Sequence, residues 1–246
     1  MRSLAKKVLF LYPHSVVQGQ MIDLLIQSEF EVATINDHQK AMQLINRFKG
    51  SILLVNIEDH LKDDEWEYFI RNVVQGQGHH QTLVGIMVYN SDSALAERYL
   101  IDIGVPCGFV QLKLGLMDST RILIKALMAN EAKGDRKYVR VSCPPRKAKM
   151  NIKTPGEQIN GELLDISSAG FACIMEKQLE NGSEFDDMQL SLIGSIMHAS
   201  GKIMGHRTQE DGKDITVILF NDISRETKGK IYQFIRKTLQ AEIDEV

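Results

Sequence analysis

The sequence predicts an α/β domain with a five-stranded parallel sheet, followed by a domain of short antiparallel strands that ends in a helix. Three observations support this prediction. Apolar strands alternate with amphipathic helices through about the first half of the chain. Beyond that half, short alternating segments are separated by turn residues. The last segment has an apolar face with helical spacing. At 246 residues, the chain has the length of two ordinary domains.

Short apolar runs mark the strands of the first half. The first of them is continuously apolar from Val8 to Tyr12, as expected of a strand that is covered on both faces. The predicted strands are residues 7–12, 31–36, 51–56, 82–89 and 107–112. Because a helical pattern follows each strand, we expect a doubly wound parallel sheet with helices on both faces.

Apolar residues at helical spacing mark the helices between these strands. The third helix begins with three carboxylates, Asp63, Asp64 and Glu65, which suit a helix N-terminus. The apolar positions expected on the five helices are Met21, Leu24, Leu25 and Phe30; Ala41, Leu44, Ile45 and Phe48; Tyr68, Phe69 and Val73; Leu95, Tyr99, Leu100 and Ile103; and Ile122, Leu123, Leu127 and Met128.

The second half has the pattern of an antiparallel barrel or sandwich. Its strands are expected at 150–152, 159–166, 170–175, 188–193, 197–204 and 215–220. Turn sequences rich in Gly, Pro, Asn and Asp separate several of them. A final helix carries Ile231, Phe234, Ile235, Leu239 and Ile243 on one face.

Composition describes a globular protein, with 43% hydrophobic and 25% charged residues. A formal net charge of −3 gives no overall attraction to nucleic acid or to a membrane. The three cysteines, Cys107, Cys143 and Cys173, have no metal-binding or redox spacing, which suggests a reduced cytoplasm. The first apolar run is too short for a signal peptide or a membrane span.

Basic residues crowd one segment that begins near the middle of the chain, where Arg136 and Arg140 stand four residues apart. Positions four apart share one side of either a strand or a helix, so the pair presents two guanidinium groups in one direction. Such groups bind phosphate or the edge of guanine through paired hydrogen bonds. Asp165 and Ser167 add hydrogen-bonding groups, and Gly170 permits close backbone approach or positive φ.

The arginine pair, followed by Asp165, Ser167 and Gly170, resembles the two motifs of the PilZ domain, a bacterial receptor module for cyclic di-GMP. The resemblance covers about the last 110 residues, and we assign 133–246 to this domain. It implies a six-stranded barrel with a C-terminal helix, and a cyclic di-GMP site at these five residues near the domain junction. Asp135 stands where many family members have a further arginine, which favours one ligand molecule per site.

The first domain, assigned to 1–132, resembles a response-regulator receiver in architecture. Its phosphotransfer residues are missing, since Asn56 stands at the expected acceptor position and Tyr89 at the hydroxyl position, and Lys113 is out of register. No carboxylates converge to hold a metal ion. We therefore expect a receiver-like domain that is not phosphorylated and that contacts proteins, including a second copy of the chain.

Several alternatives stay open. The arginines could bridge carboxylates of the first domain, the barrel could bind RNA or DNA, the module could be a PilZ-like scaffold without a nucleotide, and the chain could be a phosphorelay output protein. No nucleophile and base are paired, so we expect a cytoplasmic signalling protein rather than an enzyme, without a metal or cofactor. Its protein target is not indicated, and neither a membrane nor a nucleic-acid partner is expected.

Overall fold

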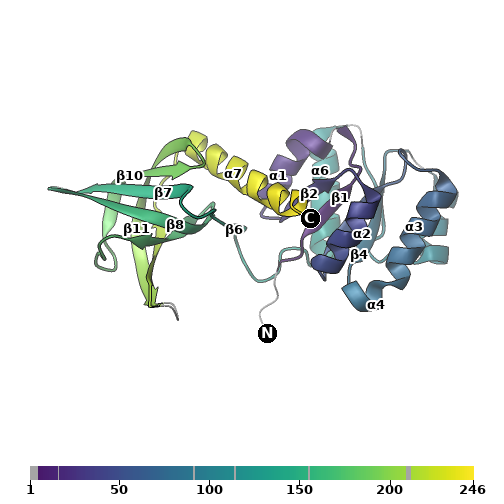
Figure 1. The fold of residues 1–246 in the computed structure, drawn as a ribbon. Coiled ribbons are helices and arrows are strands. Elements are labelled where there is room, and N and C mark those ends of the chain that lie inside the picture. Colours follow the sequence, from purple (N-terminus) through teal and green to yellow (C-terminus); the bar gives the residue numbers. More distant parts are fainter. Residues whose placement is uncertain (1–4, 16, 91, 114, 155, 209–211) are drawn as a thin grey trace. The chain divides into compact units, whose positions relative to one another are not determined.

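The computed structural model describes residues 5–15, 17–90, 92–113, 115–154, 156–208 and 212–246. By its internal contacts the chain divides into two compact units. The first consists of residues 1–137 together with 239–246, and the second consists of residues 138–238. Each unit has its own sheet (Figure 1).

The first unit has a five-stranded parallel sheet, as predicted. Its strands are β1 (Val8–Leu11), β2 (Val32–Ile35), β3 (Ile52–Asn56), β4 (Leu83–Val88) and β5 (Phe109–Gln111). The strand order is β2-β1-β3-β4-β5, with every pair parallel. All residues of β1 and β3 are buried, which is the pattern of strands covered on both faces.

Helices cover both faces of this sheet (Figure 1). The helical elements are η1 (Val17–Met21), α1 (Ile22–Gln27), α2 (His38–Arg47), α3 (Asp63–Gln75), α4 (Gln77–His80), α5 (Ser93–Glu97), η2 (Arg98–Ile103) and α6 (Leu116–Ala129), where η marks a π-helical segment. In the sheet, β2 lies on one side of β1, and β3, β4 and β5 follow on the other side. The connection from β1 to β2 therefore runs across the sheet in the opposite direction to the later connections. Because such crossovers are right-handed, α1 lies on one face of the sheet, and α2 and α3 lie on the other. Contacts place α6 beside α1.

One core cluster lies between the parallel sheet and the face that α2 and α3 cover. Trp66, Phe69 and Tyr99 belong to it. Three of the apolar residues expected on helices are instead exposed: Tyr68, Leu100 and Met128. Tyr68 was expected to be buried, and this was wrong because its neighbours Phe69 and Trp66 occupy the face of α3 that meets the sheet. Among the described residues no helix is long and apolar enough to cross a bilayer.

The second unit is a closed six-stranded antiparallel barrel, as predicted. Its strands are β6 (Arg140–Ser142), β7 (Ala148–Thr154), β8 (Glu157–Ser167), β9 (Gly170–Met175), β10 (Glu184–Leu192), β11 (Ser195–Thr208) and β12 (Asp214–Phe220). The order β8-β7-β10-β11-β12-β9 closes because β9 also pairs with β8. The short strand β6 pairs with β8 and is additional to the six.

Alternation along the strands fills the interior of the barrel. On β7, for example, Ala148, Met150 and Ile152 are buried, and the residues between them face outward. The last helix, α7 (Arg225–Asp244), buries the apolar positions predicted for it, which are Ile231, Phe234, Ile235, Leu239 and Ile243. Its final residues, from Leu239 onward, are part of the first unit, where Ile243 belongs to the core cluster.

Candidate ligand-binding site

Pairing between β6 and β8 places the second arginine of the motif beside the acid and the hydroxyl. In the register of this antiparallel pair, Arg140 lies opposite Ser167 and Ser142 lies opposite Asp165. Residues directly opposite in such a pair present their side chains on the same face. The intervening pair, Val141 with Ile166, is buried, so the two flanking pairs belong to the outer face of the barrel, where Arg140 and Ser142 are exposed and Ser167 is covered.

An irregularity in β8 sets the direction of Asp165. The register against β9 shifts between Leu163 and Asp165, and the Leu164 carbonyl accepts a hydrogen bond from the backbone of Cys143. Leu163 and Ile166 are both buried although they are three positions apart, an odd spacing that would put them on opposite faces of a regular strand. The bulge therefore turns Asp165 outward toward β6.

Arg140 and Asp165 form an ion pair across these strands. Arg140 Nη1 lies 3.5 Å from Asp165 Oδ1, with the arginine partly exposed and the acid largely shielded. Oδ1 is nevertheless buried without a hydrogen bond among the described residues. The ion pair and the lack of a hydrogen bond are compatible, because the distance between Nη1 and Oδ1 is at the upper limit for a hydrogen bond and the two groups are not aligned for one. The site thus contains a shielded acceptor, Asp165 Oδ1, and a cation, Arg140, whose contact with it is an ion pair without a hydrogen bond.

Ser167 serves the turn that follows β8. Its hydroxyl donates to the Gly170 carbonyl at 3.1 Å and accepts from the backbone of Ala169 at 3.3 Å. The side chain is buried. A hydroxyl oxygen has two lone pairs, so one acceptor position is left for a ligand donor. Contact between Ser167 and a ligand stays a prediction.

Gly170 is required by a close approach of two strands. It lies opposite Leu219 in the pairing of β9 with β12. A Cβ atom at this position would overlap the Ile218 carbonyl oxygen and lie 2.9 Å from Leu219 Cα. Its φ is not positive, so close packing is the reason for glycine here. The structure assigns this glycine to the barrel itself, and a role in ligand approach stays a prediction.

Arg136 lies in the first unit, whereas Arg140 lies in the second. The Arg136 guanidinium is close enough to influence Glu31 electrostatically. Burial raises the pKa of Glu31, and the charges of Lys7 and Arg136 act in the opposite direction. No ion pair of Arg136 is recorded among the described residues. Arg140 has its ion-pair partner, Asp165, within the barrel. The bridging of first-domain carboxylates stays an untested alternative.

Two cysteines lie near Asp165. Burial, followed by the charge of Asp165, raises the pKa of both Cys143 and Cys173 to about 12. Thiols of this kind stay protonated at neutral pH and are poor nucleophiles. Ser142, which lies opposite Asp165, is a further candidate for the site that the sequence analysis missed. Its spacing from Arg140 was an available signal, because residues two apart on a strand share a face.

The receiver-like unit has its own polar cluster at the carboxyl ends of β1, β3 and β4. Asn56, at the expected phosphoacceptor position, is buried and donates to the Tyr12 carbonyl at 2.9 Å. Its side-chain oxygen accepts from the backbone of Glu58. Both the nitrogen and the oxygen of the Asn56 side chain are thus hydrogen-bonded within the unit. Among the described residues, no group of three or more His, Cys, Asp or Glu side chains could hold a metal ion.

Glu58 ties two loops of this cluster together. Its carboxylate accepts from the backbone of Tyr89 and from the backbone and side chain of Asn90, at 2.7–2.9 Å. His14 Nε2 lies 3.1 Å from the same carboxylate. Burial lowers the pKa of His14, while Glu58 and then Asp59 raise it. The carboxylate therefore acts as an internal clamp.

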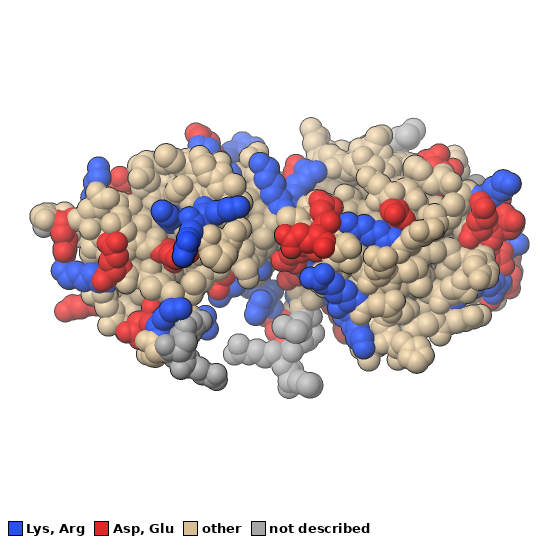
Figure 2. Space-filling view, viewed as in Figure 1, with Lys and Arg blue, Asp and Glu red and all other residues tan. Residues whose placement is uncertain are grey.

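The distribution of charge bears on the nucleic-acid alternative. On the face drawn in Figure 2, basic side chains lie next to acidic ones in both units. A nucleic-acid groove is typically a stripe of one sign. The mixed charge on this face is consistent with the net charge of −3.

Comparison with known families finds one match. The model of the PilZ domain matches residues 135–237, a range that contains all five predicted site residues. A comparison with curated proteins found no match.

Solved structures give distant likenesses. The PilZ domain with c-di-GMP of YcgR from Escherichia coli is 17% identical with a TM-score of 0.38, and the match covers 45% of this chain and 95% of that chain. The K. pneumonia MrkH–c-di-GMP complex is 12% identical with a TM-score of 0.42, covering 45% and 55%. The Bacillus subtilis inhibitor of motility MotI/DgrA is 16% identical with a TM-score of 0.37, covering 42% and 50%. The matched region is thus about half of each of the two longer proteins.

Proposed function

We propose that this chain, whose residues 135–237 form a PilZ domain, is a receptor for cyclic di-GMP. The ligand-binding residues are Arg136, Arg140, Asp165, Ser167 and Gly170. The proposal rests on the PilZ match and on the presence of both sequence motifs. It is supported by the convergence of three of these residues on one outer face of the barrel.

One observation carries the proposal. Asp165 Oδ1 is buried and makes no hydrogen bond within the described part of the chain, and the Arg140 guanidinium lies beside it at 3.5 Å. A buried acceptor without a donor is costly, and such groups are rare in folded proteins. Guanine N1–H and N2–H would supply the missing donors, and Arg140 would bind the phosphate or the O6/N7 edge of the base.

These contacts predict selectivity for guanine. Adenine has an amino donor where guanine has the O6 acceptor, and it lacks the N1–H donor. A site that is built to hydrogen-bond one base rejects the other, because its own polar groups are left unpaired. We therefore expect cyclic di-AMP to bind much more weakly than cyclic di-GMP.

Thermal unfolding of the full chain tests the proposal. A ligand at one hundred times its dissociation constant adds about 2.7 kcal/mol to the free energy of unfolding. We expect cyclic di-GMP to raise the melting temperature of the barrel in proportion to the logarithm of its concentration. Cyclic di-AMP serves as the matched control. Equal effects of the two dinucleotides, or no effect of either, would reject the receptor assignment.

The proposed output is a signal passed on by conformational change or by binding of a protein partner, not by catalysis. The buried, protonated thiols near Asp165 offer no nucleophile. The receiver-like unit is proposed to act through protein contact, including self-association. Light scattering coupled to size exclusion, with and without cyclic di-GMP, measures self-association directly.

A further inference from the structure

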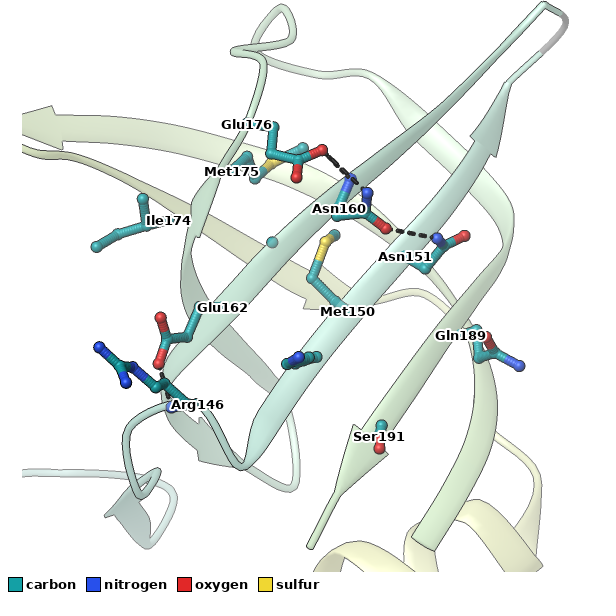
Figure 3. A pocket seen from close by; sticks show the side chains of 12 residues that line it. Arg146, Met150, Asn151, Asn160, Glu162, Ile174, Met175, Glu176, Gln189 and Ser191 are labelled. Carbon is teal, nitrogen blue, oxygen red and sulfur yellow. Dashed lines mark hydrogen bonds between the residues drawn. The ribbon is translucent and has the colours of Figure 1, made fainter. Parts of the chain in front are cut away.

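A hollow of about 770 Å³ lies on the outer face of the barrel, where β10, β7, β8 and β9 run side by side (Figure 3). Two rows of outward residues line it, according to the strand register. One row is Ser191, Lys149, Glu162 and Ile174, and the other is Gln189, Asn151, Asn160 and Glu176. This volume is within the range of small-molecule sites.

Arg146 stands at one end of the hollow in a backbone conformation that few residues adopt. Its φ is +64°, in the left-handed region. The Glu162 carboxylate accepts a hydrogen bond from the Arg146 backbone, which holds the turn between β6 and β7 in place. A left-handed residue without glycine's freedom carries a conformational cost, and such residues concentrate at functional sites. In Figure 3 the Arg146 side chain lies beside Glu162 at the hollow.

A chain of amide hydrogen bonds orders the upper wall of the hollow. Asn151 Nδ2 donates to Asn160 Oδ1 at 2.8 Å, and Asn160 Nδ2 donates to Glu176 Oε2 at 3.0 Å (Figure 3). These bonds fix the amide orientation and leave the Asn151 side-chain oxygen as an acceptor. The Gln189 amide has no recorded partner among the described residues, so it offers both a donor and an acceptor.

The two cations of the hollow have no recorded carboxylate partner among the described residues. These are the Arg146 guanidinium and the Lys149 ammonium group. Partly exposed apolar side chains, Ile174 and Met175, also line the hollow.

The two carboxylates of the lining, Glu162 and Glu176, already accept hydrogen bonds from the Arg146 backbone and the Asn160 amide. The remaining groups offer cations for a phosphate, amides for the edge of a base and an apolar surface for its face. They suit a purine nucleotide better than a neutral sugar, which would leave both cations unused.

The hollow continues the motif face along one strand. Glu162 and Asp165 are three positions apart on β8, which spans roughly 10 Å. Arg140 begins β6, and Arg146 lies in the turn between β6 and β7. We propose that the hollow binds the second nucleotide half of the dinucleotide whose first half is held at Arg140 and Asp165. Arg146 and Lys149 contact its phosphate, and Asn151 and Gln189 contact its base. This assignment rests on the proposed receptor function and adds specificity-determining residues to it.

Titration calorimetry of the full chain with cyclic di-GMP tests the assignment with four variants. Arg146→Gly removes the guanidinium and suits the left-handed backbone, so the fold is retained. Lys149→Ala removes the second cation. Lys153→Ala is the matched control, because it is an exposed lysine on the same strand and outside the hollow. Arg140→Ala reports on the motif itself.

We expect Arg146→Gly and Lys149→Ala each to weaken binding about tenfold, the usual effect of losing one charge-assisted contact. Lys153→Ala should bind like the wild type. The Asn151 and Gln189 side-chain amide signals in ¹H–¹⁵N spectra should shift when ligand is added.

The two proposals fail in different ways. If Arg140→Ala loses binding while Arg146→Gly and Lys149→Ala bind like the wild type, the hollow is not part of the site, and the receptor assignment stands. If the wild type does not bind cyclic di-GMP at all, the receptor assignment and the assignment of the hollow are both overturned.

Discussion

Gln240 pairs with both backbone polar groups of Thr34, a residue 206 positions earlier in the chain. Its side-chain oxygen accepts from the Thr34 backbone nitrogen at 3.0 Å, and its side-chain nitrogen donates to the Thr34 carbonyl at 3.0 Å. Thr34 lies on β2, the edge strand of the parallel sheet. A carboxamide thus satisfies the strand edge as a neighbouring strand would, and it leaves less of that edge open to another chain.

Replacing Gln240 with alanine should destabilise the receiver-like unit. Two backbone groups of the edge strand lose their partners, so we expect a loss of about 1–3 kcal/mol in its free energy of unfolding. Hydrogen exchange at the Thr34 amide should accelerate correspondingly. Gln233→Ala is the control, because Gln233 is an exposed glutamine of the same helix. Unchanged exchange at Thr34 would show that this pairing does not stabilise the unit.

Gly170→Ala should destabilise the barrel independently of any ligand. The new Cβ would overlap the Ile218 carbonyl, and backbone atoms cannot move aside as a side chain can. We expect a loss of at least about 1–3 kcal/mol, the usual range for overpacking, measured by urea unfolding. Gly205→Ala is the control, because no atom lies within 4 Å of its added Cβ. Equal stability of the two variants would contradict the packing explanation.

Arg140→Ala should weaken cyclic di-GMP binding by about 1–3 kcal/mol, which corresponds to roughly a 5- to 150-fold change in dissociation constant. The variant also leaves the Asp165 carboxylate without its nearby cation. Titration calorimetry measures the effect, and Arg207→Ala provides an exposed arginine on β11 as the comparison. An Arg140→Ala affinity equal to that of the wild type would remove this residue from the site.

Histidine titration should make the first unit less stable in mild acid. Burial lowers the pKa of His14 below its ordinary 6.5 in the folded protein, so below about pH 6.5 the unfolded chain binds the proton more readily. The contribution of neutral His14 to the free energy of unfolding is therefore complete above this pH. It declines as the pH falls toward the lower pKa that His14 has in the folded protein. Burial also lowers the pKa of His80, which acts in the same direction.

Urea unfolding at about pH 7.5 and about pH 5.5 measures this dependence. We expect His14→Gln to reduce the difference in stability between the two conditions, and the double variant with His80→Gln to reduce it further. His79→Gln is the control, because His79 is an exposed histidine of the same unit. A pH dependence identical in all these variants would refute the assignment to the buried histidines.

Much of the fold could be predicted because its signals are local. The continuous apolar run of β1 and the alternation on β7 each reflect the burial of a single strand, and both predictions are confirmed. The predicted PilZ domain is confirmed by the match to residues 135–237. Tyr68 was assigned wrongly because its apolar type was read as burial, although the helix turns it away from the core.

The candidate site shows where such reasoning ends. Residue spacing and the resemblance to the PilZ motifs picked out Arg140, Asp165 and Ser167, but they did not indicate that a bulge near Leu164 turns the acid outward. They also missed Ser142, which strand pairing places opposite Asp165. The reason for Gly170 was equally hidden, because the atoms that exclude a side chain there belong to a strand almost fifty residues later.

By itself the sequence determined the two kinds of sheet, most of the strands and the PilZ motifs, because periodicity and residue type act over a few neighbouring positions. Only the tertiary structure decided which side chains meet. The ion pair of Arg140 with Asp165, the clamp of Glu58 on Asn90 and the cap of Gln240 on Thr34 depend on register, bulges and distant packing. These features arise from contacts between segments far apart in the chain, and no local pattern encodes them.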